Sequence, residues 1–264
     1  MTNQSVLPLF RSHYSVGKSL LTLEEPSTAP NSGPVSVFTL AQEAGLSEVI
    51  LIDDKIDGLI QAYKSAGKAK TKLIYGIRLV VCADMANKTP ESLTTESKVV
   101  ILVKDFDGYK DLIRIWNRAW GREGHFTFRD WSYGRADWAL LKEFWTERLI
   151  LALPFFDSFI AKNTLTFAQI TPNLPVQDPW IFEEEKSGLP FESLISKAID
   201  QYVGEGDHGA RLLSKTILYR NREDFRNYIV FRALNEGGVW DNPECKHLCS
   251  AEFCMEAYKE LAQK

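Results

Sequence analysis

The chain has 264 residues, of which 45% are hydrophobic and 25% are charged. These fractions are ordinary for a globular protein with a sizeable core, and the net charge of -4 argues against a nucleic-acid-binding surface that covers the whole chain. No apolar run approaches the length that a membrane-spanning helix needs, so we expect no membrane partner.

The N-terminus and the cysteines predict a cytoplasmic protein. The first residues contain no basic segment followed by an apolar core, so a secretory signal is not expected. Four cysteines in a chain of this length do not indicate a disulfide framework. Three of them, Cys245, Cys249 and Cys254, lie around His247, but their spacing is not that of a standard zinc motif. We interpret them as free thiols.

The first part of the chain alternates apolar runs with polar turns. A short apolar patch near residues 6–10 precedes a segment rich in Pro, Ser and Gly, residues 25–36, which is typical of a surface loop. The run 49–52 is continuously apolar, which favours a strand buried on both faces, as in a parallel sheet. The elements expected up to residue 103 are a helix over 37–45, a strand over 49–52, a helix through Leu59, Ile60 and Tyr63, a strand over 72–81 and a strand over 99–103.

The second part continues the same rhythm. The region 121–135 is rich in Gly, Arg and aromatic residues and is expected to be irregular, and the acidic run 183–185 is expected to be a solvated loop. The regular elements expected here are helices over 108–120, 138–145, 191–202, 222–234 and 250–263, and strands over 149–153, 164–170 and 212–219.

Strands alternate with helical segments at least five times. This rhythm is typical of βαβ units with parallel strands and right-handed crossovers, and so many units in one chain favour a barrel over an open sheet. No internal repeat, low-complexity tract or linker interrupts the sequence. We therefore predict an α/β fold and a single domain over residues 1–264.

Two adjacent carboxylates, Asp53 and Asp54, follow the apolar run 49–52. Acidic residues at the carboxyl end of a barrel strand are where catalytic and metal-binding groups usually lie. On spacing alone, the two residues are therefore a candidate general acid/base pair or a candidate pair of metal ligands.

Several short segments match the motifs of one family in order and spacing. The most specific is Leu102-Val103-Lys104-Asp105 with Gly108-Tyr109 and Leu112, and further matches are Tyr14-Ser15, 74–78, Tyr219 with Glu223-Asp224, and Ser250 with Glu252-Phe253. Over nearly its whole length the chain resembles the PHP (polymerase and histidinol phosphatase) domain of bacterial DNA polymerase III alpha subunits. The resemblance implies a distorted (β/α)7 TIM-barrel-like fold and a place in DNA replication.

An active site of this family holds a cluster of metal ions through His, Asp and Glu at the strand ends, and the metals generate a hydroxide that attacks a phosphoester. The corresponding positions in this chain are Leu9, Arg11, Lys18, Asp54, Arg78, Lys98, Phe155, Thr216 and Leu218. Among these, Asp54 alone can still coordinate a hard cation, and four of the others are cations that repel metal. The resemblance therefore implies a degenerate metal site, no catalytic residue and no cofactor.

This comparison changes the interpretation of the two carboxylates. Asp53 and Asp54 become partners for the cations that replaced the ligands, with Arg11 or Arg78 as the expected partners. Such buried pairs contribute little net stability, but removing one partner is costly.

The resemblance implies a non-catalytic scaffold in a replicative DNA polymerase, a DNA-directed nucleotidyltransferase. The expected partners are the remaining polymerase domains or subunits and a proofreading exonuclease that docks on this domain. The chain contains no plausible set of polymerase carboxylates, so it is either an excised N-terminal domain or a stand-alone remnant. Two alternatives remain: a metal-dependent phosphoesterase or 3′–5′ exonuclease with rearranged ligands, and a module that binds single-stranded nucleic acid.

The last alternative depends on an aromatic and basic segment, residues 116–138. Interleaved cations and rings can stack and hold single-stranded DNA. They can equally form a contact surface for a protein partner, or an aromatic core beneath arginines whose charged ends reach solvent. The residues that would form such a surface are Arg118, Trp120, Arg122, Arg129, Trp131 and Tyr133.

Overall fold

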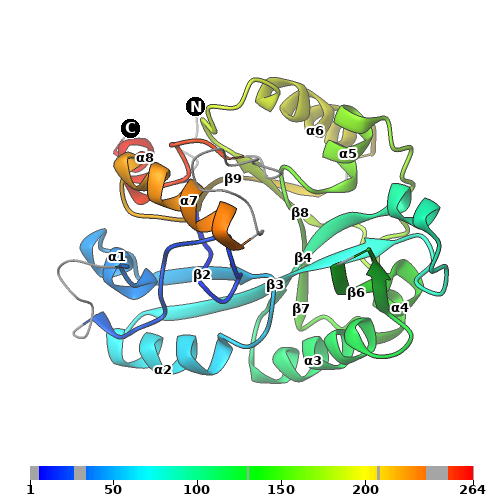
Figure 1. Ribbon diagram of the computed structural model, residues 1–264, viewed down its shortest axis with the longest axis horizontal. Helices are drawn as coiled ribbons and strands as arrows, with labels where there is room; N and C mark the ends of the chain where they lie inside the picture. The colour runs from blue at the N-terminus through cyan, green and yellow to red at the C-terminus, as the bar shows by residue number, and fades with distance from the viewer. Residues whose placement is uncertain (1–5, 27–33, 130, 207–208, 236–248, 264) are drawn as a thin grey trace. The chain divides into compact units, whose positions relative to one another are not determined.

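The computed structural model (Figure 1) describes residues 6–26, 34–129, 131–206, 209–235 and 249–263. The chain divides into two compact units. Unit 1 contains residues 1–77, 184–192 and 213–264, and unit 2 contains residues 78–183 and 193–212. The organisation of residues 1–264 as one domain stays a prediction.

Unit 1 is built on parallel strands. Strand β1 (Leu7–Phe10) pairs with β2 (Glu48–Asp53) and with β9 (Ala210–Ile217), and β2 also pairs with β3 (Lys72–Cys82). Residues 49–53 of β2 are all buried, which confirms the strand that the apolar run predicts. The carboxyl end of β2 carries Asp53, so the fold brings the predicted carboxylates to the end of a central strand.

The helices of unit 1 begin and end at local capping signals. Helix α1 (Val37–Glu43) begins after Ser36, whose hydroxyl accepts hydrogen bonds from two backbone N–H groups of the first turn, and the chain turns away at Gly45 with φ of +65°. The predicted final helix begins five residues later than expected, because Cys254 occupies its N-cap. The other helices of this unit are α2 (Leu59–Ala69), η3 (Arg222–Asp224), α7 (Phe225–Asn235) and α8 (Met255–Ala262).

Unit 2 combines parallel and antiparallel pairs. Strand β7 (Leu149–Leu153) is parallel to β8 (Trp180–Glu184) but antiparallel to β4 (Ser97–Val103), and β3 is parallel to β6 (Trp131–Asp137). The antiparallel pair departs from the all-parallel sheet that the βαβ rhythm predicts. The helices of this unit are η2 (Pro90–Thr95), α3 (Phe106–Trp120), α4 (Trp138–Phe144), α5 (Phe159–Thr166) and α6 (Glu192–Gly206).

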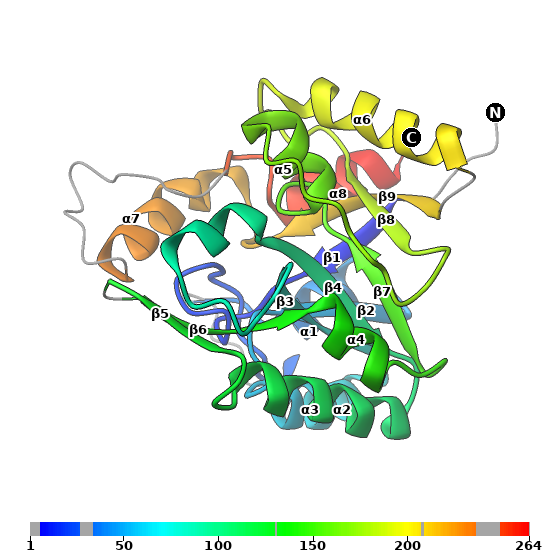
Figure 2. The same cartoon turned by 90° about the vertical axis from the view of Figure 1, so that its right-hand side faces the viewer.

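A β-hairpin occupies most of the region that the sequence predicts to be irregular (Figure 2). Strand β5 (His125–Phe128) is antiparallel to β6, with Phe128 opposite Trp131. The expectation of an irregular 121–135 segment is therefore wrong. The turn gives little warning in the sequence, because Arg129 has a φ of +52°, a conformation that hairpin turns usually assign to Gly, Asn or Asp.

The strand predicted over residues 164–170 is also wrong. The structure has helix α5 there, capped by Ser158, and residues 167–170 form no regular element. The threonines misled the prediction because β-branched residues favour strands. In the helix, the hydroxyls of Thr164 and Thr166 donate to carbonyls one turn earlier, at 2.8 and 2.7 Å, which accommodates both side chains.

The acidic run 183–185 is not a solvated loop. Glu183 and Glu184 are the last two residues of β8, and their exposed fractions are 4% and 3%. Each carboxylate has a cation from β9: Arg211 pairs with Glu183, and the Lys215 Nζ lies 3.4 Å from Glu184 Oε1. Ionised side chains are buried almost only when they are paired, and the sequence did not reveal the pairs.

The strand connectivity confirms the predicted fold class. The hydrogen-bonded order is β2-β1-β9-β8-β7-β4-β3-β6-β5, and the additional β2–β3 pairing links the first strand to the seventh. Strands alternate with helices along the chain. This is the connectivity of a distorted (β/α)7 TIM-barrel-like fold. In the described part of the chain, no helix is both long and apolar enough to cross a membrane.

Candidate functional site

The carboxylate of Asp53 organises the loop that follows β1. It is fully buried, and its oxygens accept from Ser12 N–H at 2.8 Å, Ser12 Oγ at 2.7 Å and Ser15 Oγ at 2.7 Å. Burial raises the pKa of Asp53, while the hydrogen bonds from Ser12 and Ser15 and the charge of Arg11 act in the opposite direction. The hydrogen bonds of Asp53 therefore hold the loop after β1 against the end of β2.

Replacing Asp53 with Asn should loosen this loop. An amide presents an NH2 group to at least one of three donors, so we expect a loss of about 2–3 kcal/mol in the free energy of unfolding. Urea denaturation measures the loss, and hydrogen exchange should show faster exchange at residues 11–19. Asp57→Asn is the matched control, because Asp57 is exposed, and it should cost less than about 0.5 kcal/mol. Equal stability of the two variants would contradict the role given to Asp53.

Asp54, the candidate for a surviving metal ligand, is engaged in an ion pair. Its Oδ2 lies 2.8 Å from the Nζ of Lys18, and its backbone N–H donates to Ser15 Oγ at 2.9 Å. Lys18 is one of the four cations that the family alignment brings to this site. The pair joins the loop after β1 to the end of β2 through Lys18, whereas the sequence predicts Arg11 or Arg78 as the partner.

The remaining vestigial positions of unit 1 lie on β1 and β9 or just after them. Leu9 is the register partner of Thr216, and both Leu9 and Leu218 are buried. The N–H of Thr216 donates to Glu184 Oε1 at 3.0 Å, and its hydroxyl donates to Glu184 Oε2 at 2.6 Å. Two of these positions are apolar, Thr216 is hydrogen-bonded to a carboxylate, and the fourth is the buried Arg11, so none of them offers a metal ligand.

Glu184 and Lys215 form a buried ion pair beside these positions. Lys215 is fully buried, and its Nζ also donates to the carbonyls of Glu185 at 2.7 Å and Lys186 at 3.0 Å. Burial raises the pKa of Glu184, opposed first by the charge of Lys215 and then by the hydrogen bonds from Thr216. The sequence analysis missed this pair. Because β9 also contains Arg211, Ser214 and Thr216, its sequence gives no clear signal that Lys215 is buried.

In unit 2, the vestigial positions converge on one carboxylate. Arg78 of β3 pairs with Asp157, and the Lys98 Nζ of β4 lies 3.5 Å from the same Asp157 Oδ2. The Lys98 N–H also donates to the Asp157 carbonyl at 2.7 Å. Phe155 is buried and packs edge-to-face on Phe156. Asp157 lies two residues after the expected ligand position at Phe155, and the sequence analysis did not single it out.

The donor chemistry of these positions does not fit the family's metal cluster. Zinc and manganese are bound by imidazole, carboxylate or thiolate groups. Here the corresponding side chains are ammonium, guanidinium or apolar groups, and the carboxylates beside them already pair with the cations. Within the described ranges, no group of three or more His, Cys, Asp or Glu is arranged to hold a metal ion. We derive no catalytic step through a metal.

The cysteine cluster gives no support for a zinc site in the described residues. Cys245 and His247 lie outside them. Cys254 is buried and caps α8 through its Sγ, which accepts from Ala257 N–H at 3.5 Å, and Cys249 is partly buried. Neither cysteine forms a disulfide, as the sequence predicts.

The aromatic and basic segment separates into inward-facing or paired residues and exposed ones. Tyr133 donates to Glu96 at 2.9 Å, Trp120 stacks on Trp116 with ring centroids 5.2 Å apart, and Arg118 pairs with Glu123 at 3.3 Å. Arg122, Arg129 and Trp131 are exposed, and Trp131 retains 57% of its surface. Arg118 is exposed as well despite its ion pair, so four of the six residues of the predicted surface are accessible to solvent.

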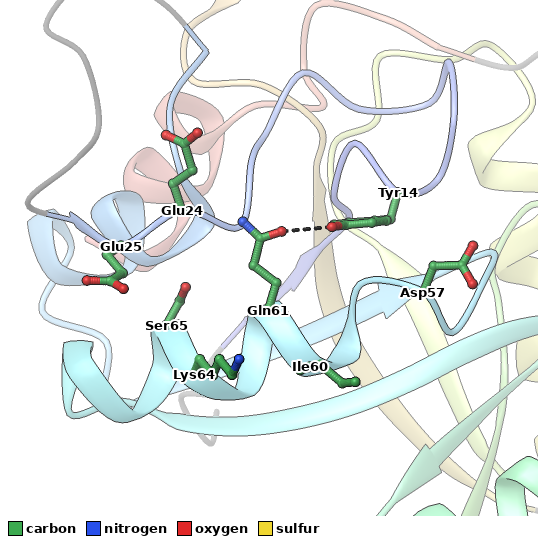
Figure 3. A pocket seen from close by; sticks show the side chains of 8 residues that line it. All are labelled: Tyr14, Glu24, Glu25, Asp57, Ile60, Gln61, Lys64 and Ser65. Atoms are coloured by element: carbon green, nitrogen blue, oxygen red, sulfur yellow. Dashed lines mark hydrogen bonds between the residues drawn. The ribbon is translucent and has the colours of Figure 1, made fainter.

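A pocket of about 550 Å3 lies on the first turns of α2 in unit 1 (Figure 3). Tyr14 donates to Gln61 Oε1 at 2.8 Å across its wall, and Ser65 donates to the Leu23 carbonyl. The rest of the lining consists of Glu24, Glu25, Asp57, Ile60 and Lys64. The lining contains neither imidazole nor thiol, and it includes none of the vestigial metal positions.

Comparisons with known proteins show which family the chain resembles. The model of the PHP domain family matches residues 31–168, just over half of the chain. The chain is also 23% identical over 216 residues to the DNA polymerase III subunit alpha of Thermus aquaticus. This match covers 77% of the chain but 17% of the polymerase subunit, so the chain spans about one sixth of that relative's length.

The family match and the strand connectivity lead to the same conclusion, which the spacing of motifs along the sequence also predicts. The chain belongs to the PHP domain family.

Proposed function

We propose that this chain is a non-catalytic PHP domain that acts as a structural scaffold in a replicative DNA polymerase. The observation that carries the proposal is the set of ion pairs at the family's metal positions: Lys18 with Asp54 in unit 1, and Arg78 and Lys98 with Asp157 in unit 2. A metal cluster ties several strand ends together. Ion pairs between the same chain segments supply a similar link without the chemistry.

The burial of these groups supports a structural role. The side chain of Arg78 is 12% exposed, and those of Asp54 and Asp157 are 18% and 29% exposed. Partly buried pairs of this kind are costly to break from one side, so they hold their segments in register. A hydrolytic site would need carboxylates or imidazoles that remain available for metal and water.

The similarity to a polymerase subunit supports a scaffold role within a DNA polymerase. In this proposal, the partners are the remaining domains or subunits of the polymerase, and the domain offers a docking site for a proofreading exonuclease. The pairs keep the domain rigid, which a surface for stable partners requires.

Metal analysis and a double-mutant cycle test the proposal. The purified chain should contain zinc and manganese far below one ion per molecule, and a chelator should leave its melting temperature unchanged. Lys18→Met and Asp54→Asn should each lower stability by about 1–2 kcal/mol, and the double variant should lose less than the sum of the two.

Metal ligation at Asp54 predicts different results. Stoichiometric zinc or manganese that is lost in Asp54→Asn but retained in Lys18→Met would overturn the proposal. Hydrolysis of a generic phosphodiester that is abolished by chelator and by Asp54→Asn would overturn it too. Lys72→Met is the matched control for the cycle, because Lys72 at the start of β3 forms an exposed pair with Glu48 at the start of β2 and its loss should have little effect.

A further inference from the structure

Helix α2 of unit 1 carries large apolar side chains on its exposed side. Ile60 and Tyr63 retain 67% and 74% of their surface, and Lys64 and Gly67 are exposed beside them. The four residues are three or four positions apart, so they lie on one side of the helix, and Figure 3 shows Ile60 and Lys64 there. We call these four residues the α2 face. Adjacent exposed apolar side chains are typical of a contact surface.

Gly67 is the small residue of the α2 face. It lies inside the helix, and a Cβ atom built on it would meet no other atom within 4 Å. The packing of the chain therefore does not require a glycine at this position, although glycine destabilises a helix interior relative to alanine. A glycine that the chain itself does not need is accounted for if another helix approaches closely from outside, because the side chains at a contact set the distance between two helices.

The charges along α2 are separated by sign. Asp57 lies in the turn before the helix, whereas Lys64 lies in its second half and Lys70 is its C-cap. None of these three side chains forms an ion pair with a residue that the structure describes, while Lys68 already pairs with Glu25. An antiparallel copy of the same helix would bring the acidic end of one helix to the basic end of the other. It would also align the two helix dipoles favourably.

We propose that the α2 face binds a second copy of this chain, helix against helix, about a two-fold axis that passes between Tyr63 and Lys64. In this register Ile60 lies opposite Gly67 of the second copy, so a large side chain meets the space above a glycine. Tyr63 lies opposite Lys64 of the second copy, which brings an ammonium group to an aromatic ring. A two-fold interface must be self-complementary, and each of these contacts occurs twice.

The same register pairs the charges that have no partner among the described residues. Asp57 lies opposite Lys70 of the second copy, again twice. A second copy suits this surface better than an unrelated partner, because one face supplies both the large residue and the space for it, and both signs of charge. One face of an 11-residue helix is a small interface, so we expect a weak dimer with a dissociation constant of roughly 10–100 μM. The inference is independent of the scaffold role.

Analytical ultracentrifugation of the full 264-residue chain tests the dimer. Between about 1 and about 300 μM, the mean mass should rise from that of one chain toward that of two. Ile60→Ser should weaken dimerisation by roughly tenfold or more, because it removes the apolar contact at both symmetric positions. A chain that stays monomeric over this range would overturn the proposal and leave the α2 face to a different partner.

Two charge reversals test the antiparallel register. Asp57→Lys and Lys70→Asp should each weaken dimerisation roughly tenfold, because each places like charges opposite one another at both symmetric contacts. An equimolar mixture of the two variants should form a heterodimer with about the parent affinity, because every lysine then faces an aspartate. If the mixture associates as weakly as the separate variants, the proposed register is wrong and the proposal falls.

A glycine substitution separates binding from folding. Gly67→Leu should raise the melting temperature of the dilute chain, because leucine favours a helix and enters open space. It should nevertheless weaken dimerisation by roughly tenfold or more, because it fills the space that accepts Ile60. Gly204→Leu is the matched control, since Gly204 is exposed on α6 of unit 2 and its added Cβ also meets no atom within 4 Å. The control should dimerise like the parent chain, and equal dimerisation by Gly67→Leu would overturn the proposal.

Discussion

Replacing Arg135 with Met is expected to lower the free energy of unfolding by about 3–5 kcal/mol, because it breaks from one side a hydrogen-bonded ion pair between a fully buried guanidinium and a largely buried carboxylate. Arg135 of β6 has no exposed surface. Its Nη1 donates to Ser92 Oγ at 2.8 Å and to Glu96 Oε1 at 3.0 Å, and its Nη2 donates to the Asn87 carbonyl.

The aromatic neighbour adds to the loss. The guanidinium carbon lies 3.8 Å from the centre of the Phe126 ring, a close cation–π contact in a dry site. Methionine can fill part of the volume, but it leaves the Asn87 carbonyl without its Arg135 donor and leaves the Glu96 carboxylate with the Tyr133 hydroxyl but no cation. The hairpin should therefore detach from the segment 87–96 before the rest of unit 2 unfolds.

Urea denaturation measures the loss, and hydrogen exchange locates it. Exchange should accelerate across β5 and β6 and change little in β4. Arg118→Met is the matched control, because Arg118 is exposed and pairs with Glu123 at 3.3 Å, so it should cost less than about 1 kcal/mol. If Arg135→Met were as stable as Arg118→Met, Arg135 would not be the residue that fixes the hairpin.

Replacing Glu184 with Gln is expected to cost a similar amount, about 3–5 kcal/mol, in unit 1. The change leaves the ammonium group of Lys215 fully buried with carbonyls as partners but without a counter-charge. It also weakens the acceptor for the N–H and hydroxyl of Thr216. Loss of the pair should loosen the end of β8 from β9.

A second substitution separates the pair from its surroundings. Lys215→Met alone should also destabilise the chain, because it leaves Glu184 buried without its cation. The double variant Glu184→Gln/Lys215→Met should be more stable than the sum of the single losses predicts, since no buried charge remains. Denaturation of the four proteins completes the cycle. Additive losses would show that the two side chains do not interact.

The neighbouring residue offers a matched control. The Glu185 side chain is partly exposed, and Glu185 contributes to this region through its backbone, which donates to Ser214 and accepts from Lys215. Glu185→Gln should therefore change stability by less than about 0.5 kcal/mol. A loss of stability as large as that of Glu184→Gln would mean that the net negative charge of the acidic run, and not the buried ion pair, stabilises the end of β8.

The buried and partly buried ion pairs have two features in common. Each joins residues that are distant in sequence, such as Lys18 with Asp54 and Arg78 with Asp157, and each lies at or beside a strand end. Strand ends in this architecture carry the polar groups of the barrel, which in most enzymes become an active site. In this chain the same polar groups satisfy one another, which agrees with the proposed structural role.

The sequence by itself determined the strand of 49–52 and the helix of 108–120, because hydrophobic periodicity reports directly on the buried face of an element. It also determined the family, whereas the loss of metal ligands stays a prediction. Ligand identity is a property of single residues, and a leucine, arginine or lysine at a ligand position excludes coordination wherever its side chain points.

Only the tertiary structure decided where the charges go. From the sequence, the acidic run 183–185 resembles a solvated loop, but in the fold β9 places Arg211 and Lys215 beside it. The threonines after Phe159 favour a strand by propensity, but Ser158 caps a helix there. The reason is physical: local patterns fix which face of an element is apolar, but the energy of a buried charge depends on partners that the fold brings from distant parts of the chain.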